Sequence, residues 1–357
     1  MYKGEAMENQ IQTPHKRRVR YKGKYPKKFE EKYKELQPEK YKDTIEHVIQ
    51  KGNTPAGMHI SIMVKEIIDF LNIQPGEIGF DATLGYGGHT KAMLKCLNGK
   101  GHIYATDVDP EESDKTKKRL ADQGFGEDLL TVKLQNFCTI DEIAKEVGGF
   151  DFILADLGVS SMQIDNPKRG FSFKVDGPLD LRLNQDAGIS AAERLDTITR
   201  DELAGMLYEN SDEPYCEELA KAITDEIRKG NRIDTTTKLR QVIEKTLDFL
   251  PEKEKKDTIK KTCQRTFQAL RIDVNREFEV LYEFMEKLPD ALRPGGRVAI
   301  LTFHSGEDKL VKKALKEGYK AGIYSDYAKD VIRPSAQECA QNGRARSTKM
   351  RWAVKNK

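Results

Sequence analysis

A glycine-dense turn is the part of the chain where the backbone is best suited to approach a ligand. Phe80 to Thr90 reads Phe-Asp-Ala-Thr-Leu-Gly-Tyr-Gly-Gly-His-Thr and continues the apolar run that starts at Ile78. Glycine reaches positive φ at low cost and has no side chain to block close contact. A strand-to-helix turn of this kind holds nucleotide-like molecules. Gly85, Gly87 and Gly88 are therefore candidates for a ligand-binding turn.

Two carboxylates follow the turn at a spacing that suits an adenosine. Asp107 and Asp109 end the next apolar run, about twenty residues past the turn. In a doubly wound sheet, a carboxylate there accepts both hydroxyls of an adenosine ribose. NAD sites and S-adenosylmethionine sites share this arrangement, so it indicates an adenosine ligand and nothing finer. A plain tight turn without a ligand is the alternative.

A third carboxylate, Asp156, lies in the segment Ala155-Asp-Leu-Gly-Val-Ser-Ser-Met-Gln163, after a later apolar run. Ligands in open parallel sheets bind beyond the carboxyl ends of the strands, so Asp156 is expected to face the same crevice as the glycine turn. An acid that only forms a turn is the alternative. His89 opens the helix after the glycine turn and lacks the clustered partners of a metal site, so no metal is predicted.

The loop from Ile164 to Arg182 mixes aromatic, arginine and turn residues. Arg169, Phe171 and Phe173 could stack on a nucleic-acid base and clamp it, because aromatic faces and guanidinium planes are the usual stacking surfaces for an unpaired base. Two buried phenylalanines that fix the loop are the alternative interpretation. The loop is thus a candidate for substrate binding.

Short apolar runs alternate with helical segments from Pro75 onward, which predicts an α/β fold with a mostly parallel sheet and helices on both faces. The alternation lapses from about Asn166 to Thr262, where charged helical stretches predict an inserted, mainly helical domain. A last alternation, Met350 to Val354, predicts an edge strand. The other expected strands are 78–84, 102–108, 129–134, 150–157 and 297–303, and the expected helices are 90–97, 110–120, 213–229, 237–249 and 267–288.

The composition and the distribution of charge limit the classes of protein to which the chain can belong. The 357 residues include 33% charged side chains but carry a formal net charge of only +3, so the overall balance does not argue for nucleic-acid binding. Basic residues cluster from Lys16 to Lys28, which predicts an arm that adds salt-dependent RNA affinity, or else a disordered solubilising tail. The five cysteines show no Cys-x-x-Cys pairing and no apolar run is long enough to span a membrane, so a reduced, cytoplasmic protein is expected.

Seven motifs follow one another along the chain between about His59 and the C-terminus. They are, in order, Asp81-Ala-Thr-Leu-Gly-Tyr-Gly-Gly-His89, Asp156-Leu-Gly-Val-Ser-Ser161, Arg169-Gly-Phe-Ser-Phe173, Gly177-Pro-Leu-Asp-Leu-Arg182, Thr266-Phe-Gln-Ala-Leu-Arg271, Phe303-His-Ser305 and Arg344-Ala-Arg-Ser347. Together they resemble, in register, the motifs of the bacterial 16S ribosomal RNA (cytosine-N4)-methyltransferase family, and this resemblance is more specific than any glycine turn alone.

The resemblance implies a class I, Rossmann-like methyltransferase fold with S-adenosyl-L-methionine as methyl donor. The implied acceptor is a cytosine near the decoding site of 16S ribosomal RNA, within the small ribosomal subunit. The oligomeric state stays open, a homodimer included. We expect a basic extension at 1–58, a cofactor-binding domain at 59–165 and 263–357, and an inserted substrate-recognition domain at 166–262. Carried over residue by residue, the cofactor contacts fall on Gly87, Gly88, His89, Asp107, Phe137, Asp156 and Gln163.

Asp156 is the hypothesised catalytic residue, because an acceptor on the N–H groups of the cytosine amine favours the rehybridisation that frees its lone pair. A carbonyl group in the turn after Asp156 could supply this acceptor instead. The same carboxylate serving only the cofactor is the alternative. Phe171 and Phe173 are candidate stacking surfaces for a splayed-out nucleotide. The candidate phosphate contacts are Arg169, Arg182, Arg271, Arg344 and Arg346.

The chain also departs from the family pattern, for example at His304-Ser-Gly-Glu-Asp308, where the family has His-Ser-Leu-Glu-Asp. The departures lie mostly in the inserted domain and the tail, where RNA would be read. A paralogue that methylates a different RNA position is therefore an alternative. A non-catalytic RNA-binding assembly factor is another, and an NAD-dependent oxidoreductase is a third, although it leaves the later motifs unexplained.

Overall fold

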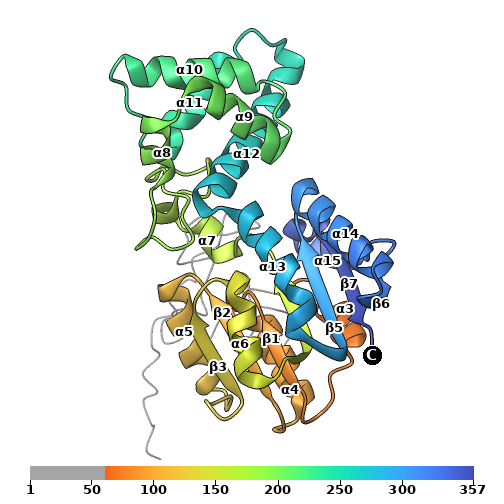
Figure 1. Ribbon diagram of the computed structural model, residues 1–357. Helices are drawn as coiled ribbons and strands as arrows, with labels where there is room; N and C mark the ends of the chain where they lie inside the picture. Colours follow the sequence, from red (N-terminus) through yellow and green to blue (C-terminus); the bar gives the residue numbers. More distant parts are fainter. Residues whose placement is uncertain (1–60) are drawn as a thin grey trace, which may run out of the picture. The chain divides into compact units, whose positions relative to one another are not determined.

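The structure is a computed structural model that describes residues 61–357 (Figure 1). The basic extension predicted at 1–58 lies outside the described residues. None of the described helices is both long and apolar enough to cross a membrane.

A seven-stranded sheet organises the described chain, with the strand order β3-β2-β1-β4-β5-β7-β6. The first five strands in chain order pair in parallel, whereas β7 runs antiparallel to both β5 and β6. This confirms the predicted α/β class with a mostly parallel, Rossmann-like sheet. The strands are β1 (Ile78–Asp81), β2 (His102–Asp107), β3 (Leu130–Leu134), β4 (Phe150–Asp156), β5 (Leu292–Thr302), β6 (Tyr324–Tyr327) and β7 (Lys349–Lys355).

Helices cover both faces of the sheet, as the alternation of the sequence predicted. Side chains along β4 point alternately to the two faces, so Ile153 and Ala155 join one apolar core while Phe152 and Leu154 join the other. The first core also holds residues of α6 (Ile140–Val147), α13 (Glu277–Ala291) and α14 (Ser305–Lys320). The second holds residues of α3 (Val64–Leu71), α4 (Gly88–Leu97) and α5 (Pro110–Ala121).

A second group of helices packs around a core of its own (Figure 1). Ser190 and Thr199 begin the first two of them with capping boxes, in which side chains satisfy free N–H groups of the first turn. The predicted division at 262/263 falls inside the longest helix of the group, which runs through it without a break. The group comprises α8 (Ala191–Thr197), α9 (Arg200–Ser211), α10 (Cys216–Arg228), α11 (Thr236–Thr246) and α12 (Glu252–Asn275).

Two predicted elements were wrong in detail. The single helix expected at 267–288 is two helices, α12 and α13, because Arg276 adopts a left-handed conformation with φ 51°. The strand expected at the edge, Met350 to Val354, is β7, which lies inside the sheet because β6 pairs along its outer side. The short β6 gave no apolar alternation strong enough to be predicted.

Candidate functional site

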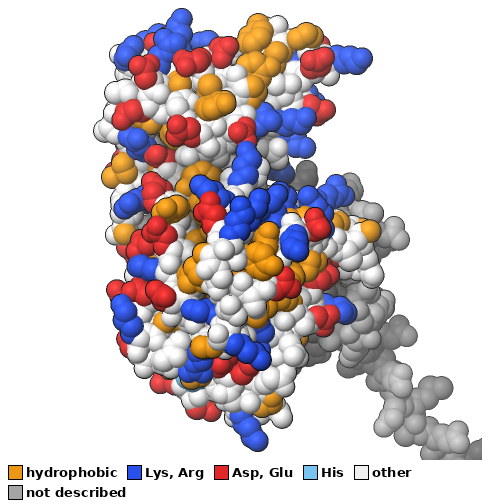
Figure 2. All heavy atoms as spheres, turned by 45° about the vertical axis from the view of Figure 1, so that its right-hand side comes forward, with side chains coloured by type: hydrophobic (Ala, Val, Ile, Leu, Met, Phe, Trp, Pro, Cys, Tyr) orange, Lys and Arg blue, Asp and Glu red, His pale blue; other side chains and the backbone are white. Residues whose placement is uncertain are grey.

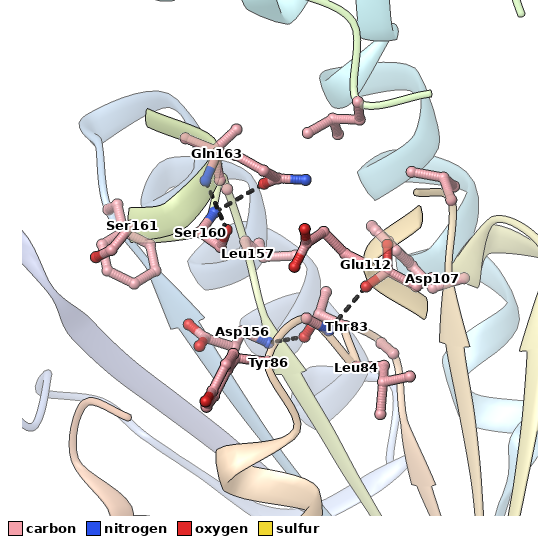
Figure 3. A pocket seen from close by; sticks show the side chains of 18 of the residues that line it. Thr83, Leu84, Tyr86, Asp107, Glu112, Asp156, Leu157, Ser160, Ser161 and Gln163 are labelled. Carbon is pink, nitrogen blue, oxygen red and sulfur yellow. Dashed lines mark hydrogen bonds between the residues drawn. The ribbon is translucent and has the colours of Figure 1, made fainter. Parts of the chain in front are cut away.

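A cavity of about 370 Å³ opens at the carboxyl ends of β1, β2, β4 and β5 (Figure 3). Its walls are the glycine turn after β1, the end of β2, the segments that follow β3 and β4, and residues from the α12–α13 junction and the start of α14. All of the cofactor contacts expected from the family resemblance line this one cavity. They are Gly87, Gly88, His89, Asp107, Phe137, Asp156 and Gln163.

The glycines of the turn are needed for close packing as well as for ligand access. Gly85 and Gly87 have positive φ values of 47° and 74°. A Cβ atom at Gly87 would lie 2.7 Å from the side chain of Thr116, and one at Gly88 would lie 2.0 Å from Ser61 Oγ. Gly85 faces open space, where the nearest atom to an added Cβ is 3.9 Å away. The turn thus packs tightly against its neighbours and leaves backbone open to the cavity.

Asp107 is held in place by the backbone around it. Its two carboxylate oxygens accept hydrogen bonds from the N–H groups of Gly85, at 2.7 Å, and Asp109, at 3.0 Å. Burial raises the pKa of the Asp107 carboxyl to about 6, although these two N–H donors lower it. At neutral pH the group is therefore a carboxylate at the edge of the cavity, able to accept from two neighbouring hydroxyl groups.

His89, at the start of α4, and Asp156, at the end of β4, form a pair on the wall of the cavity. His89 Nδ1 lies 3.3 Å from Asp156 Oδ2, and Nε2 lies 2.8 Å from the carbonyl oxygen of Ile62. Burial lowers the pKa of His89, but the hydrogen bond and charge of Asp156, together with the Ile62 carbonyl, outweigh it and raise the pKa overall. Both neighbours are acceptors, so the imidazolium, which carries a proton on each ring nitrogen, fits the arrangement best.

The second oxygen of Asp156 has no partner in the described chain. Asp156 Oδ1 is buried and makes no hydrogen bond, while the backbone N–H of Asp156 donates to Thr83 Oγ1 at 2.7 Å. A buried carboxylate oxygen without a donor is costly. In Figure 3 this side chain lies beside Tyr86 and Thr83 at the cavity. The side chain as a whole is 24% exposed and lines the cavity, so a small rotation would bring Oδ1 to a donor group that enters it.

A buried network that the sequence did not reveal joins the loop after β4 to the end of β2. Asp109 is fully buried, and its Oδ2 receives the side-chain amide of Gln163 at 2.9 Å and the guanidinium of Arg169 at 2.8 Å. Its Oδ1 caps α5 by accepting from the N–H of Glu112. Gln163 also closes the capping box of α7 (Ser161–Asp165) with Ser160. The network fixes the position of the cavity wall formed by the segment after β4.

The structure does not bring the predicted substrate contacts together. Phe171 and Phe173 pack against the helical core, and the Phe173 ring lies 5.8 Å from that of Phe267. Arg182 pairs with Asp180 at 2.8 Å and lies outside the cavity.

Three further arginines were predicted to contact phosphates, and two of them line the cavity. Arg271 makes a two-point ion pair with Glu277, and Arg344 pairs with Asp165 at 2.9 Å; both line the cavity. Arg346 is exposed and does not line it.

The β5 side of the cavity carries a cluster that sequence reasoning missed. Glu277, His304 and Glu307 offer ligand atoms that all lie within 4.8 Å of one another. Glu307 is 3% exposed and accepts from the N–H of Phe303 at 2.8 Å. Burial raises the pKa of Glu307, but His304 and Arg271 outweigh it and lower the pKa overall. The position of His304 and Glu307 just past the end of an apolar strand was the available signal.

The charge of the cavity suits a cationic ligand with a ribose. Both lining guanidiniums, Arg271 and Arg344, are neutralised by carboxylates, which leaves negative charge in excess. Asp107 can accept from ribose hydroxyls and Phe137 offers an aromatic face held edge-on by Phe284, with ring centroids 5.2 Å apart. The residues present therefore fit S-adenosylmethionine, whose sulfonium is positively charged. The lining carboxylates are Asp107, Glu112, Asp156, Glu277 and Glu307.

Comparisons with known sequences point the same way. Residues 56–356 match a family model described as the MraW methylase family. A relative from Agathobacter rectalis, named ribosomal RNA small subunit methyltransferase H 1, is 88% identical over 96% of this chain and 98% of its own. A relative from Alkaliphilus metalliredigens, named ribosomal RNA small subunit methyltransferase H 2, is 62% identical over 95% and 97%. Among solved structures, a SAM-dependent O-methyltransferase from Thermotoga maritima matches with a TM-score of 0.38 at 11% identity, covering 88% of this chain and 71% of that one.

Proposed function

Because the chain belongs to the MraW methylase family, we propose that it transfers a methyl group from S-adenosylmethionine to the exocyclic N4 of a cytosine in 16S ribosomal RNA, near the decoding site. One observation carries the chemical part of this proposal. The cavity that fits the donor also holds Asp156, whose Oδ1 is buried and has no partner in the described chain. After a small rotation of this partly exposed side chain, an amine that enters the cavity would supply the missing donor.

The cofactor would be held on the β1–β2 side of the cavity. Asp107 would accept from the ribose hydroxyls, Phe137 would contact the adenine face, and the backbone at Gly85 would lie against the methionine end. S-adenosylmethionine supplies an electrophilic methyl group on a sulfonium when bound. The chain's own contribution is to orient the acceptor nitrogen in line with that methyl group and to exclude water.

The cytosine amine is a weak nucleophile, because its lone pair is conjugated into the ring. A carboxylate oxygen that accepts from one of its N–H groups favours the pyramidal nitrogen and stabilises the positive charge that develops there. Asp156 Oδ1 is available for this contact, and His89 holds the other oxygen of the same carboxylate. We also assign to Asp156 the role of general base, which takes the proton that the nitrogen releases after it attacks the methyl group.

The acceptor base would enter on the β5 side. In the sheet β4 lies between β1 and β5, so Asp156 separates the glycine turn from the cluster of His304 and Glu307. Carboxylates accept hydrogen bonds from the exocyclic amine of cytosine, whereas uracil presents a carbonyl at the same place. The buried Glu307 carboxylate therefore favours cytosine over uracil in this part of the cavity.

A methyl-transfer assay tests the proposal. Small ribosomal subunits and naked 16S RNA, both from cells that lack this chain, are incubated with the purified protein and S-adenosylmethionine carrying a labelled methyl group, and the RNA is digested for nucleoside mass spectrometry. The expected product is labelled N4-methylcytidine at one site. Label on another nucleoside, or RNA binding without any label, would contradict the proposal and favour a paralogue or an assembly factor.

A further inference from the structure

The helical part of the chain carries a second concavity that the reaction does not use. It lies between the loop at Phe173 and Lys174, α11 and α12, and encloses about 670 Å³. Its lining residues are Phe173, Lys174, Arg240, Glu244, Lys245, Asp248, Lys255, Lys256, Ile259, Lys260 and Cys263. Below we call it the α11–α12 groove.

The charge of the α11–α12 groove is strongly positive. Six of its lining side chains are basic and two are acidic, which leaves an excess of four positive charges. The whole chain of 357 residues carries a formal net charge of only +3. On the face drawn in Figure 2, Lys and Arg side chains form several groups interspersed with acidic and hydrophobic side chains. A concave surface with this charge attracts polyanions.

Some basic side chains of the groove already form ion pairs or hydrogen bonds, and others form no ion pair within the described residues. Lys255 pairs with Asp248 at 2.6 Å and with Glu252 at 3.2 Å, and Arg240 donates to the carbonyl oxygen of Phe173. By contrast, the exposed Lys174, Lys256 and Lys260 form no ion pair with any residue from 61 to 357. Lys256 and Lys260 lie one turn apart on α12 and therefore on the same face of the helix.

The groove also has an apolar side. Phe173 and Ile259 line it, so one of the two aromatic residues that the sequence predicted to stack on a base lies here and not in the cofactor cavity. Burial raises the pKa of the Cys263 thiol to about 12, which keeps it protonated and unreactive. A basic track beside an aromatic side chain is the usual construction for holding single-stranded nucleic acid.

We propose that the α11–α12 groove is a second RNA-binding site, which holds the phosphodiester backbone of a single-stranded segment outside the cofactor cavity. The inference rests on the proposed function, since it takes the substrate to be RNA. Lys174, Lys256 and Lys260 contact phosphates, and Phe173 with Ile259 supports a base or sugar. The site increases the affinity for RNA and fixes the position of the bound strand relative to the cofactor cavity. It does not take part in methyl transfer.

The double variant Lys256→Gln/Lys260→Gln tests the proposal, with Lys312→Gln/Lys313→Gln on the exposed side of α14 as the matched control. The affinity of each protein for 16S RNA is measured as a function of KCl concentration. Loss of two phosphate contacts lowers the slope of log K against log salt by about 1.4, at about 0.7 per contact for single strands. The control keeps the wild-type slope, and the thermal shift caused by S-adenosylmethionine is the same in all three proteins.

The outcomes separate this proposal from the proposed function. The salt slope is read without turnover, so it is informative even if the wild-type protein methylates no RNA. A groove variant with the wild-type slope overturns the proposal. So does a variant that keeps its slope on naked RNA but loses affinity for the assembled subunit, because the groove would then bind a protein. A reduced slope in the groove variant alone supports it.

Discussion

The guanidinium of Arg169 lies 2.8 Å from the carboxylate of Asp109, and only 6% and 1% of the two side chains is exposed. Arg169 also donates to the carbonyl oxygen of Leu183 at 2.6 Å. This arginine therefore fastens the loop after β4 to the end of β2 and is not free to hold an RNA phosphate. Its position next to the Gln163–Asp109 hydrogen bond links the loop to the cofactor side of the cavity.

Arg169→Ala is expected to destabilise the protein by about 3 kcal/mol, because it leaves the buried Asp109 carboxylate without its counter-charge. The affinity for S-adenosylmethionine should fall as well, since the Asp109 carboxylate that accepts from Gln163 loses the guanidinium that holds it in position. Urea unfolding and calorimetric titration measure the two effects. As a control, Arg228→Ala removes an exposed pair with Asp225 and should cost less than about 1 kcal/mol. Equal costs for the two variants would contradict this account.

The affinity for S-adenosylmethionine should weaken in acid. Asp107 has a pKa of about 6, and its neutral form accepts ribose hydroxyls less well. The dissociation constant is expected to rise up to about tenfold per pH unit below pH 6. Titrations from pH 5 to pH 8 measure it.

Asp107→Asn should weaken binding at pH 7.5 and remove most of this acid dependence. Two effects on stability oppose each other in this variant. The amide keeps only one acceptor for the N–H groups of Gly85 and Asp109, which costs stability. It also removes a carboxylate whose ionisation costs stability as pH rises from about 4 to 6, because the folded protein binds the Asp107 proton more tightly than the unfolded chain. An unchanged pH profile in Asp107→Asn would show that another group controls binding.

His89 should contribute stability that depends on pH in the opposite sense. Its pKa is raised in the folded protein by Asp156 and the Ile62 carbonyl. The contribution is therefore fully present below pH 6.5 and is lost as pH rises through the folded-state pKa. Urea unfolding of the wild type and His89→Gln from pH 6 to pH 9 measures it, and the two curves should converge at the alkaline end. Parallel curves would mean that His89 is neutral throughout.

Glu307→Gln is expected to lower methyl transfer to RNA by about tenfold or more, because a buried carboxylate acceptor is replaced by an amide. The affinity for S-adenosylmethionine should stay near that of the wild type, since Glu307 lies on the β5 side of the cavity. The matched control is Glu317→Gln, an exposed residue later on the same helix. If Glu307→Gln lost donor binding while Glu317→Gln kept it, the division of the cavity into donor and acceptor sides would be wrong.

The cofactor side of the site could be predicted because it depends on strand ends. Gly87, Asp107 and Asp156 each follow an apolar run, and in a parallel sheet the carboxyl ends of all strands lie at one edge. No contact between distant residues had to be known. The same logic located the candidate turn and both carboxylates on the cavity wall.

The arginine contacts could not be predicted, because each depends on a partner far away in the sequence or across a turn. Arg169 pairs with Asp109 and Arg344 with Asp165, and no local pattern selects these carboxylates. The break between α12 and α13 is similar. Asn275 bonds to the loop at Leu181 and Leu183, which holds the chain while Arg276 adopts its left-handed conformation. Tertiary contacts decided both features.

In the proposed mechanism Asp156 acts on the acceptor nitrogen and does not serve only the donor. The decisive experiment compares Asp156→Asn with the wild type in two assays, single-turnover methyl transfer to 16S RNA and calorimetric titration with S-adenosylmethionine. We expect a rate lowered by about 100-fold or more, with the donor dissociation constant changed by less than about threefold. A variant with the full rate and a weakened affinity for the donor would contradict it.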